Sequence, residues 1–309
     1  MKSLLLTLAL TAFALGENLT IGPDYKDAPE TKEQKNVPKG KVTDFTMSSK
    51  DSKIYPGIAK GKDGTVPYER KVAVYVPKQY RKGSEAPFIV VHDGMWYRGV
   101  LPTILDNLIA QKRIPPIVAI MVHSGGGDSK GSQRGLEYDT VSGLFSDFIE
   151  TEVLPLVERK CRVELTDNPD GRATMGGSSG GAAAFTMAWF HPERYHRVLT
   201  YSGTYVDQQW PENSDSPNGA WEYHDKLIPN TPAKPLRIWL QVSEHDNGAD
   251  KDEASHHNWV LANERMAKAL AAKDYDSQYV FSKGAKHTDG RVTRQTLPAA
   301  LEWLWKGYH

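Results

Sequence analysis

The chain has 309 residues, which suits one large domain, and its 39% hydrophobic and 25% charged residues are ordinary for a soluble globular protein. Its 38 Lys and Arg residues are balanced by 38 Asp and Glu residues, so the formal net charge is zero. Nothing therefore indicates nucleic acid or an anionic membrane as a partner, because both bind to surfaces with an excess of positive charge.

The first 16 residues read as a cleavable secretory signal peptide. Lys2 gives a short positively charged start, residues 4–15 are apolar apart from two threonines, and Ala14 and Gly16 are the small residues that signal peptidase requires. The apolar run is shorter than the ~20 residues that cross a bilayer as a helix, so no membrane span is expected. We therefore expect an exported protein, either secreted or periplasmic.

The stretch 17–53 is polar, rich in Lys, Asp and Pro, and shows no periodicity. We predict that it is a flexible lead-in lying over the surface of the folded domain. That domain is expected to run from residue 54 to residue 309.

From residue 54 onward, strand-like and helix-like segments alternate. The continuous apolar runs 88–91 and 117–122 fit strands buried on both faces of a parallel sheet. Further strands are predicted at 72–76, 173–175, 198–201, 238–242 and 279–281. Apolar residues at helical spacing predict helices at about 140–160 and 259–271. This alternation predicts an α/β fold, a three-layer sandwich around a mainly parallel sheet.

A glycine-rich turn follows the strand at 173–175. The segment 175–184 (MGGSSGGAAA) opens into an Ala-rich helix, which fits the G-x-S-x-G nucleophile elbow in its strand–turn–helix setting. Flanking glycines frame either Ser178 or Ser179, so the register is ambiguous. We choose Ser178, because the two glycines after Ser179 then clear room where the helix leaves the turn. The Ser179 amide would then be one donor of an oxyanion hole.

A nucleophile elbow needs an acid and then a histidine further along the chain. Asp246 follows the strand at 238–242 and His287 follows the strand at 279–281, and open α/β sheets place their sites beyond the carboxyl ends of strands. We predict that His287 takes the proton from Ser178 and returns it to the leaving alcohol. Asp246 would hold the imidazole in the useful tautomer.

Neighbouring residues compete for the roles of acid and base, namely Glu244, Asp250, His245, His256 and His257. The acidic segment 246–253 fits no strong calcium pattern. The adjacent histidines lack carboxylates at ligand spacing, so no metal is expected.

The second oxyanion donor is expected in the loop after the strand at 88–91. The segment 92–97 (HDGMWY) begins directly after that strand, and Gly94 permits an unusual turn there. The Met95 amide, or else the Trp96 amide, would then point into the site.

These segments together resemble the putative-esterase branch of the α/β hydrolases, which includes ferric enterobactin esterases, feruloyl esterases and esterase D. The resemblance covers roughly residues 53–305, and it is carried by 55–57 (YPG) with 74–77 (VYVP), 92–97, 176–181 (GGSSGG) and 258–287. It implies the same nucleophile, acid and base as the residues themselves do. It implies no metal and no organic cofactor.

The same family often carries an Arg and a Glu-Tyr pair before the long helix, here Arg134, Glu137 and Tyr138. We interpret these three residues as part of a substrate pocket, with bracing of the loop as the alternative. Trp96 and Trp259 are the other candidate substrate-binding residues.

This chain departs from the enterobactin esterases because it has no evident basic cluster for a triply anionic siderophore. It also has an insert of its own at 204–235, which contains Trp210, Trp221 and Tyr223. These aromatic residues would either stack on a sugar or phenol or pack the insert over the edge of the sheet.

The sequence therefore predicts an exported serine esterase that forms an acyl-enzyme with a small-molecule or carbohydrate ester, for example an acylated carbohydrate or an aryl or feruloyl ester. Two alternatives stay open. One is an acyltransferase that uses the same triad with an alcohol as acceptor, and the other is a non-catalytic binding protein on a hydrolase scaffold. The sequence gives no oligomeric state.

Overall fold

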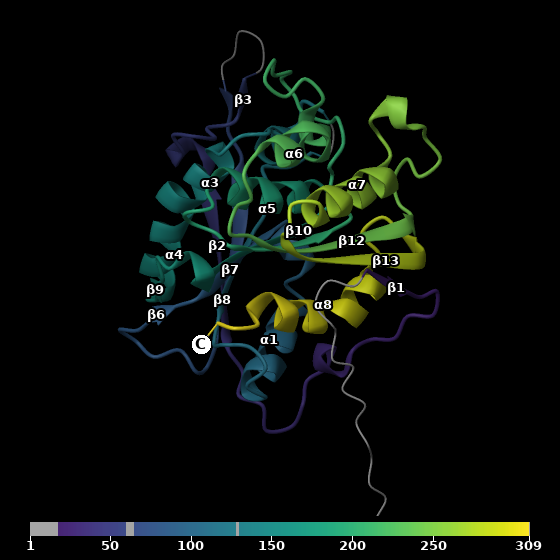
Figure 1. Ribbon diagram of the computed structural model, residues 1–309. Helices are drawn as coiled ribbons and strands as arrows, with labels where there is room; N and C mark the ends of the chain where they lie inside the picture. The colour runs from purple at the N-terminus through teal and green to yellow at the C-terminus, as the bar shows by residue number, and fades with distance from the viewer. Residues whose placement is uncertain (1–17, 60–64, 128–129, 309) are drawn as a thin grey trace, which may run out of the picture.

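Helices cover both faces of a central sheet (Figure 1). The computed structural model describes residues 18–59, 65–127 and 130–308, so the predicted signal peptide at 1–16 lies outside the described residues. One face carries α1 (Leu101–Ala110) and α8 (Gly290–Trp305). The other face carries α2 (Gln133–Tyr138), α3 (Leu144–Phe148), α4 (Leu154–Cys161), α5 (Ser179–Phe190), α6 (Ile228–Asn230) and α7 (Trp259–Ala271). The predicted three-layer α/β sandwich is confirmed.

In the described part of the chain the sheet has nine strands in the order β1-β13-β12-β11-β10-β7-β8-β5-β2. Neighbours from β1 to β8 run parallel, whereas β5 pairs antiparallel with both β8 and β2. The strands predicted from sequence are all present, as β5 (Glu69–Val76), β7 (Phe88–His92), β8 (Val118–Val122), β10 (Arg172–Gly177), β11 (Arg197–Tyr201), β12 (Arg237–His245) and β13 (Asp276–Lys286). Two small pairings lie outside this sheet, between β3 (Ile58–Ala59) and β4 (Thr65–Val66) and between β6 (Glu85–Ala86) and β9 (Glu164–Leu165).

The prediction that residues 17–53 form a flexible lead-in is wrong for two of its segments, which are strands of the central sheet. β1 (Leu19–Ile21) pairs in parallel with β13, and β2 (Lys41–Ser48) pairs antiparallel with β5 along its whole length. Both strands lie at an edge of the sheet, where one side of the strand meets solvent. Several side chains of β2 are exposed and can be polar. The segment therefore has no continuous apolar run from which a strand could be predicted.

The helix predicted at 140–160 is interrupted in the structure. Residues Ile149–Val153 form a π-helical turn between α3 and α4, and Pro155 is the second residue of α4. Proline has no backbone N–H and its ring crowds the carbonyl one turn earlier, so a regular α-helix cannot pass through it unchanged. The wide turn absorbs this defect while the apolar face stays directed at the sheet.

Two hydrophobic clusters fix the sheet between its helix layers. One lies under α1 and α8 and contains Ile89 and Leu301, and the other lies under α5 and α7 and contains Val90 and Phe185. Adjacent residues of β7 thus point into opposite clusters, as a strand buried on both faces requires. Helix α5 is buried along nearly its whole length, which fixes the turn that joins it to β10.

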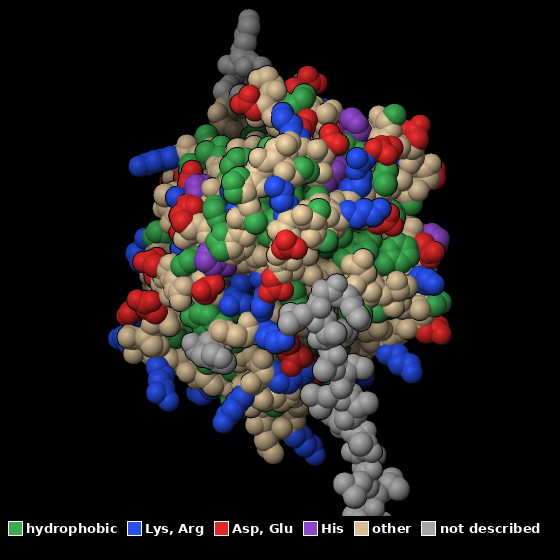
Figure 2. All heavy atoms as spheres, in the orientation of Figure 1, with side chains coloured by type: hydrophobic (Ala, Val, Ile, Leu, Met, Phe, Trp, Pro, Cys, Tyr) green, Lys and Arg blue, Asp and Glu red, His purple; other side chains and the backbone are tan. Residues whose placement is uncertain are grey.

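Positive and negative side chains are intermingled on the face shown in Figure 2, in keeping with their equal numbers in the sequence. None of the described helices is both long enough and apolar enough to span a membrane.

Candidate active site

The turn between β10 and α5 holds Ser178 in an unusual backbone conformation, with φ 57° and ψ −132°. Non-glycine residues held in such regions cost free energy and cluster at functional sites. The Ser178 amide donates to the Tyr201 carbonyl at 2.9 Å, which fixes the turn against β11. The turn is also very tight, because a Cβ on Gly176 would lie 2.2 Å from the Gly180 carbonyl oxygen.

Three predicted site residues meet above the carboxyl ends of three strands. Ser178 follows β10, Asp246 follows β12 and His287 follows β13. The distance from Ser178 Oγ to His287 Nε2 is 2.9 Å, and that from His287 Nδ1 to Asp246 Oδ1 is 2.5 Å. These partners favour the tautomer in which Nδ1–H donates to the carboxylate and Nε2 accepts from the serine hydroxyl. This arrangement can remove a proton from a serine that attacks a carbonyl carbon.

The structure also separates the two serines between which the sequence left a choice. The Ser179 side chain is buried, and its hydroxyl accepts a hydrogen bond of 3.4 Å from the Gln208 side chain. Ser178 is therefore the serine whose hydroxyl reaches His287.

Backbone and side-chain donors surround the buried Asp246 carboxylate. Its Oδ2 accepts from the Ser202 hydroxyl at 2.6 Å and from the Ser243 amide at 3.2 Å, and its Oδ1 accepts from the Asn247 amide at 2.9 Å. The Ser202 hydroxyl in turn accepts from the Thr288 amide at 3.1 Å. Ser202 thus connects the acid loop to the base loop, and the sequence reasoning missed it.

The competing acidic and histidine residues have other partners or lie in the open. Glu244 accepts from the Gly284 amide at 2.7 Å, and the His256 ring stacks on Trp221 at 4.8 Å between centroids. His245 and Asp250 are exposed, and the His257 Nδ1 lies 2.7 Å from the Ser255 carbonyl oxygen. The described residues contain no group of three or more His, Cys, Asp or Glu side chains placed to hold a metal ion.

The loop after β7 supplies the other half of a possible oxyanion hole. Asp93 has a left-handed conformation with φ 49°, and Gly94–Trp96 form a 3₁₀ turn. The Trp96 amide donates to the Asp93 carbonyl at 3.0 Å inside this turn, so of the two predicted amides Met95 is the available one. The Ser179 amide is the first of α5, and such amides have no acceptor within their own helix.

Burial favours the neutral forms of one histidine and two tyrosines around this loop. It lowers the pKa of His92 to about 4. Burial, and after it the charge of Asp93, raises the pKa of the Tyr97 and Tyr138 phenols. The Asp93 carboxylate in this loop is paired with the Arg134 guanidinium at 2.7 Å.

The two tryptophans predicted to bind substrate differ in exposure. Trp96 is 59% exposed and follows Met95 directly. Trp259 is almost buried, packs edge-on against the His287 ring at 6.2 Å, and donates through Nε1 to the Thr204 hydroxyl at 3.2 Å. The Thr204 hydroxyl lies 3.5 Å from Ser178 Oγ, so Trp259 contacts His287 directly and is connected to Ser178 through Thr204.

Arg134, Glu137 and Tyr138 are all buried. Arg134 donates to Asp93, and the Tyr138 hydroxyl accepts from the Asp93 amide at 3.2 Å. The Glu137 carboxylate accepts from the Arg70 guanidinium at 2.7 and 2.8 Å. These contacts support the alternative role, bracing of the loop, for the three residues of α2.

The insert at 204–235 packs mainly through its aromatic residues. Trp221 and Tyr223 are buried, and the Tyr223 hydroxyl lies 2.7 Å from that of Thr186 in α5. Trp210 is 48% exposed, with the Lys130 ammonium 5.8 Å from its ring centroid. Packing thus accounts for two of the three predicted stacking residues.

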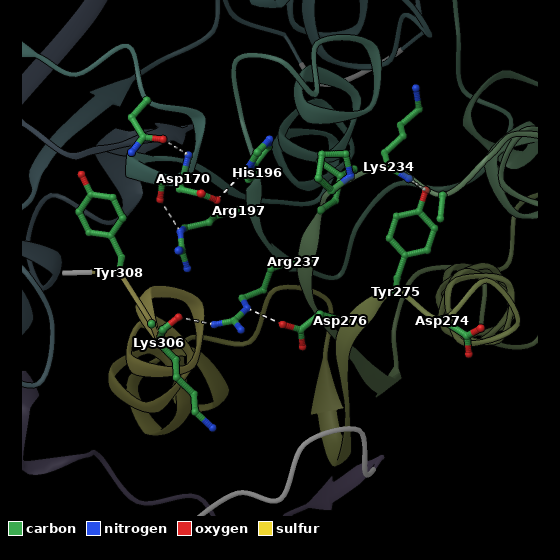
Figure 3. Close-up of a pocket in the computed structure, with 15 residues that line it drawn as sticks. Asp170, His196, Arg197, Lys234, Arg237, Asp274, Tyr275, Asp276, Lys306 and Tyr308 are labelled. Atoms are coloured by element: carbon green, nitrogen blue, oxygen red, sulfur yellow. Dashed lines mark hydrogen bonds and ion pairs between the residues drawn. The ribbon is translucent and has the colours of Figure 1, made fainter.

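Two cavities lie at opposite ends of the sheet. One of about 610 Å³ includes Thr288, the residue after His287, and is lined by Trp96, Tyr97, Gly99, Val100, Thr288, Gly290, Thr293 and Arg294. The other, of about 780 Å³, lies where β11, β12 and β13 begin (Figure 3). There the Arg197 and Arg237 side chains donate to carbonyl oxygens at the end of α8. The second cavity is thus remote from Ser178, and its arginines cap a helix.

The model of the family described as putative esterase matches residues 64–304. The iron(III) enterobactin esterase of Dickeya dadantii is 28% identical over 247 residues, which are 77% of this chain and 52% of that relative. This chain therefore spans about half the length of that curated relative.

Solved structures of similar fold include the enterobactin esterase of Shigella flexneri, at 21% identity and a TM-score of 0.60, over 89% of this chain and 61% of that one. A ferulic acid esterase aligns at 17% identity and a TM-score of 0.62, over 86% of this chain and 98% of the other. At such identities the likeness shows the fold. The family match covers most of the chain, and we conclude that the protein belongs to the putative esterase family and has the α/β-hydrolase fold.

Proposed function

We propose that this protein is an exported serine esterase that hydrolyses carboxylic esters through an acyl-enzyme. The observation that carries the proposal is the short chain of contacts from Ser178 Oγ to His287 at 2.9 Å and from His287 to Asp246 at 2.5 Å. It starts at a serine whose strained backbone presents the hydroxyl at the end of a buried helix. Membership of an esterase family supports the same reaction class.

In the first half-reaction, Ser178 Oγ attacks the ester carbonyl carbon while its proton passes to His287 Nε2. The carbonyl oxygen becomes negatively charged, and the Ser179 and Met95 amides donate to it. As the bond to the alcohol breaks, His287 gives its proton to the leaving oxygen. In the second half-reaction, water gives a proton to His287 Nε2 and attacks the acyl carbon. The bond from that carbon to Ser178 Oγ then breaks, His287 returns the proton to Oγ, and the acid leaves.

The cavity of about 610 Å³ beside the base supports an aryl or sugar group as one half of the ester. Trp96 offers a large exposed indole face there, and the Thr288 and Thr293 side chains line the same space. The Arg294 guanidinium at this cavity is already paired with Asp27 at 2.6 Å. A neutral ligand group therefore fits the cavity better than a multiply charged one.

Export is proposed from the first 16 residues. The first strand of the sheet, β1, begins at Leu19, shortly after the expected cleavage at Gly16. Cleavage there leaves every strand of the described sheet in the mature protein.

The test is hydrolysis of p-nitrophenyl acetate and methyl ferulate by the purified wild type, Ser178→Ala and Ser179→Ala, together with labelling by a fluorophosphonate probe. We expect turnover and labelling in the wild type, loss of both in Ser178→Ala, and labelling retained in Ser179→Ala. Loss of labelling only in Ser179→Ala would refute the assignment of the nucleophile. A wild type that neither turns over a range of esters nor labels would refute the esterase proposal.

A further inference from the structure

A buried ion pair lies behind the loop that carries the Met95 amide. Asp93 is fully buried, and its Oδ2 accepts hydrogen bonds of 3.0 and 2.7 Å from the Arg134 guanidinium. That guanidinium also lies 5.8 and 5.6 Å from the ring centroids of Trp96 and Tyr138. Because Arg134 is only 4% exposed, solvent screens neither charge of the pair.

The carboxylate of this pair faces the first turn of α5. A methyl group on Gly180, the second residue of that helix, would lie 3.4 Å from Asp93 Oδ2. The amides of this turn are those that would stabilise an oxyanion formed at Ser178. A negative charge fixed beside them opposes a second negative charge unless a cation compensates it. His123 lies 3.6 Å from Asp93 Oδ1, but Arg134 makes the closer, doubly hydrogen-bonded contact.

Helix α2 is itself anchored, so Arg134 has a fixed position. The Arg134 amide donates to the Gly126 carbonyl at 2.9 Å. Three residues later, Glu137 forms its buried ion pair with Arg70 of β5 and also accepts from Gln133 at 2.7 Å. The helix is thereby tied to the sheet on one side while it holds Asp93 on the other.

The residue after α2 reaches the second half of the oxyanion hole. The Gln208 side chain donates to Asp139 Oδ2 at 2.9 Å and to the Ser179 hydroxyl at 3.4 Å. One short helix thus contacts the Met95 loop directly and the Ser179 residue through a single glutamine. This connection gives α2 a means to set the spacing between the two amides.

We propose that Arg134 is a positioning residue for the oxyanion hole. It neutralises and orients Asp93. The loop that carries Met95 then keeps the left-handed backbone conformation of Asp93, and the first amides of α5 still attract a developing oxyanion. The proposal rests on the esterase function proposed above. It differs from a role in which Arg134 binds an anionic substrate, because here the guanidinium acts through its ion pair with Asp93.

The experiment measures kcat and KM for p-nitrophenyl acetate, a small neutral ester, in Arg134→Met, Asp93→Asn and the double variant. Removing the cation leaves a buried carboxylate beside the hole, so we expect Arg134→Met to lower kcat about 10- to 100-fold with little change in KM. The double variant removes both charges, and we expect it to recover most of that loss. Asn also tolerates the left-handed conformation of residue 93, so the Asp93→Asn variants differ from the wild type in charge and not in backbone strain.

A matched control is Arg172→Met. Arg172 is as well buried as Arg134 and pairs with Glu150 at 2.6 Å, but it begins β10 at the end of the strand farthest from Ser178. Its loss should lower stability without lowering kcat of the folded protein.

A second variant, Arg134→Lys, keeps a positive charge and should retain more activity than Arg134→Met. It replaces Arg134→Met in the comparison if that variant does not fold.

A double variant no more active than Arg134→Met would overturn the proposal, and so would an effect of Arg134→Met confined to KM. If the wild type showed no Ser178-dependent ester turnover, the proposed function would fail first. The rate of Ser178 labelling by the fluorophosphonate would then decide the present proposal, because phosphonylation also places an oxygen in the hole. Equal labelling rates in the wild type and Arg134→Met would refute it.

Discussion

The Ser202 hydroxyl donates a hydrogen bond of 2.6 Å to the Asp246 carboxylate. Because Ser202 also accepts from the Thr288 amide, next to His287, it fixes the acid and the base relative to one another. This serine lies just after β11, between the strands that end near the nucleophile and the acid.

We expect Ser202→Ala to lower kcat about ten-fold with little change in KM, as loss of an outer support of a functional group typically does. The Asp246 carboxylate loses its shortest side-chain donor apart from His287, and the Thr288 amide loses its acceptor. Steady-state kinetics with p-nitrophenyl acetate measure the effect. The control is Ser282→Ala, since Ser282 is equally buried but hydrogen-bonds to Gln241. Equal kcat values for the two variants would contradict a positioning role for Ser202.

Removal of Glu137 should destabilise the protein strongly. Glu137→Leu leaves the Arg70 guanidinium buried without its carboxylate, and breaking such a pair costs about 3–5 kcal/mol of unfolding free energy. Urea unfolding followed by tryptophan fluorescence measures the change. Asp44→Asn breaks the exposed pair with Arg98 and should cost less than about 1 kcal/mol. If both variants unfold at the same urea concentration, the buried Arg70–Glu137 pair contributes no more to the unfolding free energy than the exposed Arg98–Asp44 pair.

Trp96→Ala should selectively weaken the binding of aryl substrates. Its indole is 59% exposed at the cavity beside the base, so its removal takes away contact area from a bound ring and little from the core. We expect KM for methyl ferulate to rise roughly ten-fold, the equivalent of about 1.4 kcal/mol, while p-nitrophenyl acetate changes much less. Trp210→Ala removes another exposed indole, from the insert, and serves as the control. A KM that rises more in Trp210→Ala would move the aryl site to the insert.

His92 predicts how stability depends on pH. Burial lowers its pKa to about 4 in the folded state, whereas an unfolded histidine titrates near about 6.5. Between these values the unfolded state binds the additional proton. The contribution of His92 is therefore intact above about pH 6.5 and is lost as the pH falls towards 4, by about 3 kcal/mol in total.

Unfolding free energies measured from pH 7 to pH 4.5 test this expectation. His92→Asn should flatten the decline, because the titrating group is gone, whereas substitution of the exposed His245 by Asn should leave the slope as in the wild type. An unchanged slope in His92→Asn would show that other groups govern acid unfolding.

The proposed catalytic triad could be predicted because its residues follow strands in a fixed order. Parallel strands end at one edge of the sheet, so Ser178, Asp246 and His287 are brought together by topology alone. The two glycines after Ser179 favoured Ser178 over Ser179, and in the structure it is the Ser178 hydroxyl that lies 2.9 Å from His287 Nε2.

The supporting residues could not be predicted in the same way. Whether Arg134 meets a substrate or Asp93 depends on side-chain directions across 41 positions of chain. Nothing in the sequence distinguishes Ser202 from the other serines. Its role depends on the contacts of its hydroxyl with Asp246 and with the Thr288 amide. The edge strand β2 was not predicted, because Asp44 and Thr46 face solvent and give the segment the polar composition of a loop.

The pairing of β1 with β13 sets a limit on how far the front of the chain can be shortened. Leu19, Thr20 and Ile21 cover the outer side of β13. A chain that began after Ile21 would expose the backbone N–H and C=O groups of β13 along an open edge, next to the segment that carries His287. Such an edge is a template for another molecule, so the shortened chain would tend to join with copies of itself, and His287 would lie beside the new junction.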